Sequence, residues 1–228
     1  MRILFFDTET TGNTPEDRIV QLAIKERAVA TPIINELFKP AFPIPFEASA
    51  VHHISNKMVD NKPIFKESPR YLEIKDLFES PDTIVVAHNS AFDVAMLEAE
   101  DIHPTNIICT LKTVRTLDVD AKFTNYKLQY LRYALDMELE VPAHDALADV
   151  IVLEQLFEYL IKKIIDDGIS ESDALKKMES ITKEPVLIKD INFGKYKGSR
   201  LEDVVQKDRC YISCLLTEKI KNPIGEED

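Results

Sequence analysis

Two carboxylates, Asp7 and Glu9, stand one residue apart at the end of an apolar run from Ile3 to Phe6. Four consecutive apolar residues predict a strand that is buried on both faces. Because side chains alternate along a strand, Asp7 and Glu9 should point in the same direction. Two like charges on one face repel each other and resist the loss of solvent. We therefore expect a hard cation to lie between them.

Two further carboxylates stand where helices are expected to begin. Asp93 is the third residue after Ser90 in the segment HNSAFD, which follows an apolar strand. Read alone, this spacing predicts a capping box in which Asp93 returns a hydrogen bond to the backbone of Ser90. Asp149 lies in the segment HDALAD. Read alone, Asp149 would belong to the solvated face of a long helix.

His144 precedes Asp149 by five residues. Five residues of helix turn through roughly 500°, so the two side chains would not share a face if both were helical. We therefore place His144 in the loop before the helix and Asp149 in the first turns. A histidine has an unperturbed pKa of about 6.5 and can act as a general base near neutral pH. A solvated loop histidine is the alternative.

Taken together, the D-x-E strand, the strand ending in H-N-x-x-F-D and the later H-x-x-x-x-D resemble the DnaQ-like exonucleases of the DEDDh type. The resemblance covers about residues 1–162. It implies an α/β protein with a ribonuclease H-like mixed sheet flanked by helices (the DnaQ-like exonuclease fold) and 3′-5′ exonuclease activity. The defining residues of the family correspond to Asp7, Glu9, Asp93, His144 and Asp149.

The resemblance implies two Mg²⁺ or Mn²⁺ ions, and four hard oxygen donors suit these ions better than zinc. Asp7 would bridge both ions. Glu9 and Asp149 would complete the site next to the nucleophilic water, and Asp93 would help to hold the second ion, partly through water. His144 would take the proton of the nucleophilic water.

In this family the backbone after the second carboxylate receives the 3′-terminal nucleotide. The implied substrate-binding residues come from four segments and are Thr8, Thr10, Thr11, His52, Ile54, Asn89 and Phe92. Packing in the core is the alternative for His52, Ile54 and Phe92. For the neighbouring His53, core packing is the favoured interpretation.

Hydrophobic periodicity predicts the elements that must position these residues. Strands are expected from residue 3, over 18–24, within 33–38, over 83–87 and near 107–109. Short loops between the first three strands predict an antiparallel meander. Helices are expected over 71–78, from residue 90, and over 127–135, 145–165 and 172–181. We expect Gly168 to end the longest helix.

The predicted organisation is an exonuclease domain over 1–165, a helical linker over 166–185 and a small α+β module over 186–221. The module begins with a strand over 188–193 and continues into helices near 201–205 and 211–216. The segment INFGKYKG, followed by D-x-x-Y-I, resembles the C-terminal module of exonuclease X-type enzymes. Cys214 stands where that family usually has Trp, so the role of the Trp does not transfer.

Basic and aromatic side chains alternate in this module and suit a nucleic-acid strand. A solvated hairpin tip is the alternative. The candidate accessory DNA contacts are Lys195, Tyr196, Lys197 and Arg200.

The chain of 228 residues carries a net charge of -12, which argues against a general basic footprint for nucleic acid. The charge is uneven: residues 1–160 contain 15 Lys and Arg against 26 Asp and Glu, whereas residues 161–228 contain 13 against 14. Bound cations would neutralise part of the acidic half. Three cysteines without zinc-like pairs, no signal-peptide pattern and no membrane-spanning run predict a cytoplasmic protein.

The resemblance predicts an exodeoxyribonuclease that releases nucleoside 5′-monophosphates from single-stranded DNA or frayed duplex 3′ ends, in DNA repair or proofreading. A 3′-5′ exoribonuclease is one alternative, because the same metal site serves both sugars. A catalytically inactive nucleic-acid-binding scaffold is another, and its natural sign would be the loss of a ligand residue. Homodimer formation and binding to replication or repair proteins stay open.

Overall fold

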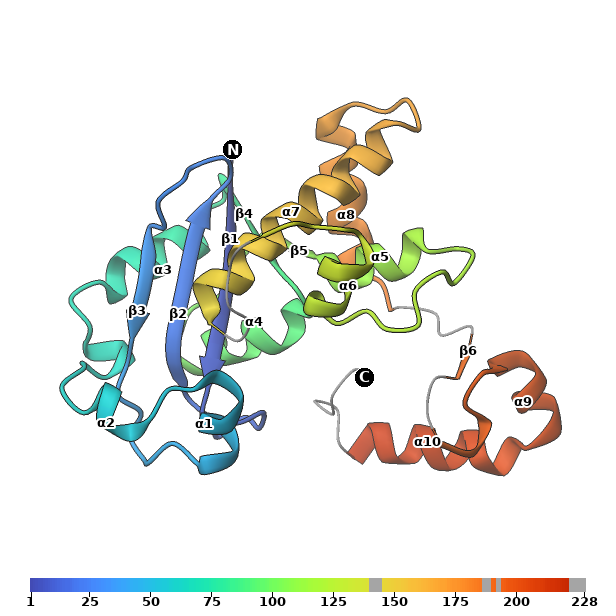
Figure 1. Ribbon diagram of the computed structural model, residues 1–228, viewed down its shortest axis with the longest axis horizontal. Coiled ribbons are helices and arrows are strands. Elements are labelled where there is room, and N and C mark those ends of the chain that lie inside the picture. The colour runs from blue at the N-terminus through green and yellow to red at the C-terminus, as the bar shows by residue number, and fades with distance from the viewer. Residues whose placement is uncertain (140–144, 186–189, 192–193, 222–228) are drawn as a thin grey trace.

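The computed structural model describes residues 1–139, 145–185, 190–191 and 194–221. A five-stranded mixed sheet lies at its centre, in the order β3-β2-β1-β4-β5 (Figure 1). The strands are β1 (Arg2–Thr10), β2 (Ile19–Glu26), β3 (Ile34–Leu37), β4 (Thr83–Ala87) and β5 (Ile107–Cys109). β1 pairs antiparallel with β2 and parallel with β4. The predicted antiparallel start and the mixed α/β class are confirmed.

Helices cover both faces of this sheet. Core side chains of α3 and α4 pack on one face, and those of α7 and α8 pack on the other (Figure 1). The described helices are α1 (Phe46–His52), α2 (Asn56–Val59), α3 (Tyr71–Glu79), α4 (Ser90–Ala99), α5 (Thr110–Leu117), α6 (Leu128–Ala134), α7 (Ala146–Ile165), α8 (Glu171–Lys183), α9 (Leu201–Lys207) and α10 (Arg209–Lys221). Single 3₁₀ turns span Phe65–Glu67 and Gly194–Tyr196. No helix in the described residues is long and apolar enough to cross a membrane.

Alternate side chains of β1 enter different core layers. Phe5 packs against a phenylalanine of α7, with ring centroids 5.2 Å apart. Phe6 packs on the opposite face against a phenylalanine of α3, with ring centroids 4.8 Å apart. Because residues two apart on a strand point the same way, Asp7 and Glu9 continue the row of Phe5 and face α7.

The predicted strands and long helices agree closely with the structure, but α5 was not predicted. Three threonines and a valine in its eight residues are β-branched and disfavour a helix. Its buried Leu111 and Val114 are three residues apart and share one face of the helix. Burial of this face therefore overrides the local propensity.

The ends of α7 follow from local hydrogen bonds. Asp145 is the N-cap, and its Oδ1 accepts from the amide of Ala148 at 3.2 Å. Beyond the helix, Gly168 has a φ of 90° and donates its amide to the carbonyl of Ile165 at 2.8 Å. The helix itself ends at Ile165 with Asp166 as its C-cap, so Gly168 ends the turn that follows α7 rather than the helix.

The C-terminal unit contains a two-stranded antiparallel ribbon, β6 (Asp190–Ile191) and β7 (Ser199–Arg200), followed by α9 and α10. The rest of the strand predicted over 188–193 lies outside the described residues. Figure 1 shows this unit to one side of the large sheet. Cys210 and Cys214 are both exposed free thiols on α10.

Candidate metal centre and nucleotide site

Three carboxylates meet where β1 ends beside the first turn of α7. Asp7, Glu9 and Asp149 each offer a carboxylate oxygen, and these oxygens all lie within 4.8 Å of one another. Asp7 and Glu9 are half-buried. As predicted, β1 places the carboxylates of Asp7 and Glu9 on one face of the sheet. The first turn of α7, which packs on that face, supplies the carboxylate of Asp149.

A register shift in the pairing of β1 with β2 falls between Glu9 and Thr10. Such bulges bend a strand and redirect the side chains next to them. In the turn that follows, a Cβ on Gly12 would come within 2.6 Å of the carboxylate of Asp17, so only glycine fits without displacing that side chain. The turn therefore supports the position of Glu9 at the end of β1.

Asp93 reaches the same end of the sheet from α4. Its Oδ1 accepts hydrogen bonds from the Thr8 amide at 3.1 Å and from the Thr8 hydroxyl at 2.7 Å. The capping-box prediction is wrong, because Asn89, in a left-handed conformation with φ 61°, occupies the N-cap and no side chain caps the helix. Ser90 therefore belongs to the first turn, and Asp93 binds Thr8.

The electrostatics of the site favour a cation. Burial, and then the charges of Asp93, Glu9, Asp149 and Asp145, raise the pKa of Asp7 well above its ordinary value. Burial and the same neighbouring aspartates raise the pKa of Glu9 to about 8. Burial outweighs the hydrogen bonds from Thr8 and raises the pKa of Asp93 to about 7. A divalent cation would relieve the repulsion that causes these shifts.

We expect the Glu9→Gln variant to be more stable than the wild type at pH 8 in EDTA, with a smaller difference at pH 5. The folded wild type holds the Glu9 proton up to a pKa of about 8, whereas unfolded Glu ionises near 4.5. The stabilisation from that proton is therefore complete below about pH 4.5 and is lost as the pH rises through 8. Thermal unfolding measures the difference, and each kcal/mol moves the Tm by roughly 2–4 °C in a domain of this size.

Added Mn²⁺ should raise the Tm of the wild type more than that of Glu9→Gln, because the variant lacks one charged oxygen donor. Asp76→Asn, an exposed change on α3, is the control and should follow the wild type. A Tm difference between Glu9→Gln and the wild type that is the same at pH 5 and pH 8 would contradict the electrostatic account.

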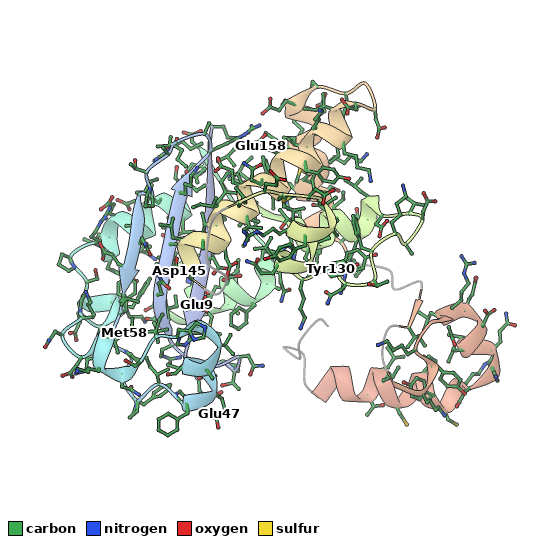
Figure 2. All side chains as sticks on the ribbon, in the orientation of Figure 1. Glu9, Glu47, Met58, Tyr130, Asp145 and Glu158 are labelled. Carbon is green, nitrogen blue, oxygen red and sulfur yellow. The ribbon has the colours of Figure 1, made fainter. Side chains whose placement is uncertain are left out.

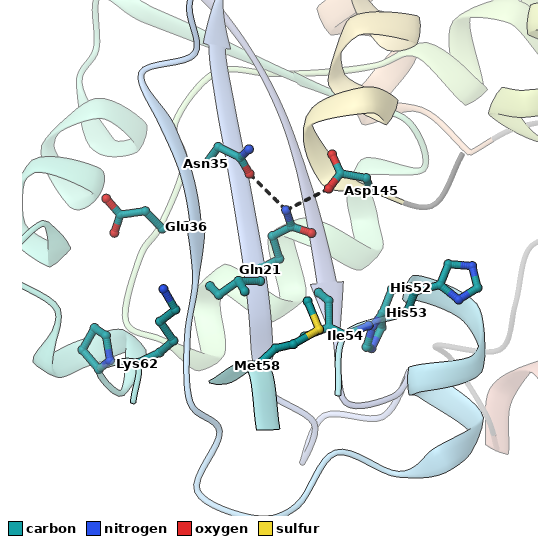
Figure 3. Close-up of a pocket in the computed structure, with 11 residues that line it drawn as sticks. Gln21, Asn35, Glu36, His52, His53, Ile54, Met58, Lys62 and Asp145 are labelled. Carbon is teal, nitrogen blue, oxygen red and sulfur yellow. Dashed lines mark hydrogen bonds between the residues drawn. The ribbon is translucent and has the colours of Figure 1, made fainter. Parts of the chain in front are cut away.

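A polar cluster joins the start of α7 to the sheet beside Glu9. Gln21 is the cross-strand partner of Glu9. Its Nε2 donates to Asn35 Oδ1 at 3.0 Å and to Asp145 Oδ2 at 3.4 Å (Figure 3). Its Oε1 accepts from the Ala146 amide at 3.4 Å. Gln21 therefore fixes the first turn of α7 over the sheet. Figure 2 labels Glu9, near the end of β1, and Asp145, at the start of α7.

A pocket of about 750 Å³ extends from this cluster across β2 and β3 (Figure 3). Gln21 and Asn35 form part of its floor, and Asp145 borders it on the side of α7. His52 and Ile54 line it from the segment around α1. The pocket therefore adjoins the carboxylate group and includes two of the predicted nucleotide-binding residues.

The segment around α1 fixes the neighbouring side chains. His52 is 5% exposed, and its Nδ1 accepts from the Ile54 amide at 3.0 Å, while its Nε2 is buried without a hydrogen-bond partner in the described residues. Burial lowers the pKa of His52. Ile54 packs in a small apolar cluster with Val20, Ile44 and Val59. The expectation of core packing for His53 is wrong, because His53 is exposed at the left-handed C-cap of α1.

The threonines after Glu9 use their hydroxyls within the turn. Thr10 Oγ1 donates to the carbonyl of Gly12 at 2.6 Å. Thr11 Oγ1 donates to Asp17 Oδ1 at 2.6 Å and accepts from the Arg18 amide at 3.0 Å. These hydroxyls hold the shape of the turn, and the Thr11 amide also donates within it, to the Arg18 carbonyl at 3.0 Å.

Of the other predicted site residues, two belong to α4 or its N-cap and one lies outside the described residues. Phe92 is partly buried against the core on the α4 side, and Asn89 begins that helix. His144 lies outside the described residues, so its role as general base stays a prediction. His88, next to Asn89, is a structural residue: its Nε2 is 2.8 Å from the Tyr126 carbonyl, and burial lowers its pKa to about 4.

The candidate DNA contacts of the C-terminal unit divide into two groups. Lys195 Nζ lies 2.8 Å from Asp208 Oδ2, and the hydroxyl of Tyr196 donates to the same oxygen at 2.9 Å. These two side chains therefore stabilise the unit itself. Arg200 forms an exposed ion pair with a glutamate of α9 at 3.2 Å, and Lys197 is exposed.

Sequence reasoning missed two polar residues that contact the site, Gln21 and Gln129. The amide of Gln129, on α6, donates to Asp149 Oδ1. Each residue interrupts an apolar pattern: Gln21 lies inside the run IVQLAI, and Gln129 follows Leu128 in a helix with an apolar face. A polar residue inside a buried pattern could have marked both as partners of a buried polar group.

Comparisons with known proteins agree with this arrangement. The RNase_T family, described as exonuclease, matches residues 4–157. Exodeoxyribonuclease 10 of Escherichia coli K12 is 29% identical over 216 residues, which cover 92% of this chain and 88% of that protein. DNA polymerase III subunit epsilon of Treponema pallidum is 33% identical over 168 residues, which cover 68% of this chain and 74% of that protein.

Solved structures show the same fold. Exonuclease X in complex with 5′ overhanging duplex DNA has a TM-score of 0.59 and 25% identity, and covers 79% of this chain and 99% of that chain. Escherichia coli exonuclease I in complex with a dT13 oligonucleotide has a TM-score of 0.60 and 20% identity, and covers 73% of this chain and 43% of that chain. The predicted DnaQ-like fold, with a mixed sheet flanked by helices, is confirmed.

Proposed function

The chain belongs to the RNase_T family of exonucleases, and we propose that it removes nucleotides from the 3′ ends of DNA by two-metal hydrolysis. The observation that carries the proposal is the convergence of Asp7, Glu9 and Asp149, whose oxygens lie within 4.8 Å. Asp93 lies beside this group, because it accepts hydrogen bonds from the amide and hydroxyl of Thr8, the residue between Asp7 and Glu9. All four carboxylates that the family chemistry requires are present.

The donor set fits hard divalent cations. In the part of the chain that the structure describes, the group contains carboxylate oxygens and no thiol, which suits Mg²⁺ or Mn²⁺. Asp7, Glu9 and Asp149 would hold one ion, and Asp7 with Asp93 would hold the second. When bound, such ions stabilise negative charge on the attacking and leaving oxygens of a phosphoryl displacement.

The residues of the chain supply position and a base. His144 takes the proton of the attacking water, which lets the water attack the terminal phosphodiester. The Thr8 amide and hydroxyl restrict the rotation of the Asp93 carboxylate. Gln21 holds the first turn of α7, which begins two residues after His144 in the sequence. The products of this cleavage are nucleoside 5′-monophosphates.

We propose DNA as the substrate, in single strands or frayed duplex ends, and DNA repair or proofreading as the setting. The support is the similarity to exodeoxyribonuclease 10 over 92% of the chain, together with the likeness to exonuclease X bound to a 5′ overhanging duplex. A 5′ overhang leaves a recessed, base-paired 3′ end, which must fray before its terminal nucleotide is available as a single strand.

The C-terminal unit would add phosphate contacts outside the catalytic centre. We expect Lys197→Ala to weaken binding to single-stranded DNA to a similar extent for different sequences. The negative slope of log affinity against log salt should become shallower by about 0.7, the value for one lost phosphate contact on a single strand. Affinity measured from 50 to 300 mM salt, at inactivating EDTA concentrations, gives this slope.

Lys207→Ala, on α9, removes the same charge from the same unit and should keep the slope of the wild type. Removal of residues 185–228 should make the slope of log affinity against log salt shallower still, while the turnover at saturating DNA stays the same. An unchanged salt slope in both Lys197→Ala and the truncated protein would assign another role to the C-terminal unit.

Parallel digestion of DNA and RNA of one sequence tests the proposed substrate. Each strand carries a 5′ label and is incubated with Mg²⁺ or Mn²⁺. We expect faster shortening of the DNA. Faster shortening of the RNA would overturn the substrate assignment and favour an exoribonuclease, and no shortening of either strand by the wild type would favour a binding protein.

A further inference from the structure

We propose that Gln129 is a positioning residue for the metal ligand Asp149, and that buried Arg132 fixes the orientation of the Gln129 amide. The inference rests on the proposed function, because Asp149 is assigned there to hold a cation. Gln129 and Arg132 lie three residues apart on α6 and share one face of that helix. The two residues form a connection from the interior of the protein to the carboxylate group.

The hydrogen bonds determine the direction of the Gln129 amide. Arg132 Nη1 donates to Gln129 Oε1 at 3.3 Å, and Gln129 Nε2 donates to Asp149 Oδ1. A guanidinium can only donate, and an ionised carboxylate can only accept. An amide with one acceptor and two donors therefore satisfies both neighbours in only one orientation.

Arg132 is itself held firmly. Arg132 is only 7% exposed, and its second terminal nitrogen, Nη2, donates to the carbonyl of Leu139. Its guanidinium also lies 5.4 Å from the ring centroid of Tyr133. These contacts limit the movement of Arg132 and, through it, the movement of the Gln129 amide.

Glutamine suits this place better than a second charged residue. An arginine in direct contact with Asp149 would compete with a cation for the carboxylate. A glutamate would place another negative charge beside a group that already contains Asp7 and Glu9. The neutral amide restricts the rotation of the Asp149 carboxylate without either effect, so both oxygens of that carboxylate keep a defined direction.

Mn²⁺ binding to the metal-free protein, without DNA, tests the proposal. Free Mn²⁺ is counted by electron paramagnetic resonance in titrations of the full chain. Gln129→Met removes the amide at nearly constant volume, and we expect its Kd for Mn²⁺ to rise by about 10- to 100-fold, the usual cost of losing a group that orients a metal ligand. Gln155→Met, the same change at an exposed position of α7, should keep the wild-type Kd.

The rate of DNA digestion provides a second measurement. The Mn²⁺ concentration that gives half of the maximal rate should rise in Gln129→Met by the same factor, and saturating Mn²⁺ should restore most of the rate. A purely structural role would instead lower the Tm in EDTA and leave the Kd for Mn²⁺ unchanged. If Gln129→Met does not fold, Gln129→Ala is measured in its place, with the same expected increase.

An unchanged Kd in a folded Gln129 variant would overturn the positioning role while leaving the proposed function intact. Failure of the wild type to bind Mn²⁺ would overturn both, because the carboxylate group would not be a metal centre. The two failures are therefore distinguished by the wild-type titration alone.

Discussion

Asp7→Asn should lower the turnover of DNA by about 10³-fold or more. Asp7 lies at the centre of the carboxylate group, and the charges of four neighbouring acidic residues act on it. Replacing its carboxylate with an amide removes the donor assigned to both cations. Each such ion contributes several kcal/mol to the stabilisation of the transition state, and about 4 kcal/mol corresponds to 10³ in rate. Single-turnover digestion of a 5′-labelled strand measures the loss.

Asp76→Asn is the matched control, because it makes the same chemical change at an exposed position of α3, on the other face of the sheet. Its turnover should equal that of the wild type. If Asp7→Asn retained more than a tenth of the wild-type rate at saturating Mg²⁺, the assignment of the catalytic centre to the end of β1 would be wrong.

His144→Ala should lower the turnover by about 10²- to 10⁴-fold, the range for the loss of a general base, while the affinity for DNA is retained. An unperturbed histidine titrates near pH 6.5, so the wild-type rate should rise between about pH 5.5 and 7.5. The variant should lose this rise, and its rate should increase only as the hydroxide concentration increases. Rates and affinities across this pH range test the prediction.

His103→Ala is the control, since His103 is exposed on the loop before β5, away from the carboxylates. It should keep both the rate and the pH profile. Equal turnover of His144→Ala and the wild type at pH 7 would remove His144 as the base, and a loss of rate that comes with an equal loss of DNA affinity would make it a binding residue.

Strand geometry made part of the site predictable. The period of two along β1 placed Asp7 and Glu9 together, and the pattern of apolar residues after Asp145 placed Asp149 in the first turns of α7. These inferences need only local periodicity and the apolar runs beside the carboxylates. The sheet and the long helices were predictable for the same reason.

Contacts between distant segments were not predictable in this way. The bond from Thr8 to Asp93 joins residues 85 positions apart, and only the fold shows that it replaces a capping box. The contact of Gln129 with Asp149 joins α6 to α7. The backbone angle of Asn89, which sets the start of α4, also depends on tertiary packing that a local pattern does not contain.

Digestion of a single-stranded DNA that carries a 5′ label tests whether the protein is a metal-dependent 3′-5′ exonuclease. With Mg²⁺ present, we expect labelled products that shorten one nucleotide at a time from the 3′ end, with unlabelled nucleoside 5′-monophosphates released from the start. EDTA or a blocked 3′ hydroxyl should prevent this. Early release of a labelled mononucleotide would show cleavage from the 5′ end, and shortening that continues in EDTA would show that divalent cations are not required.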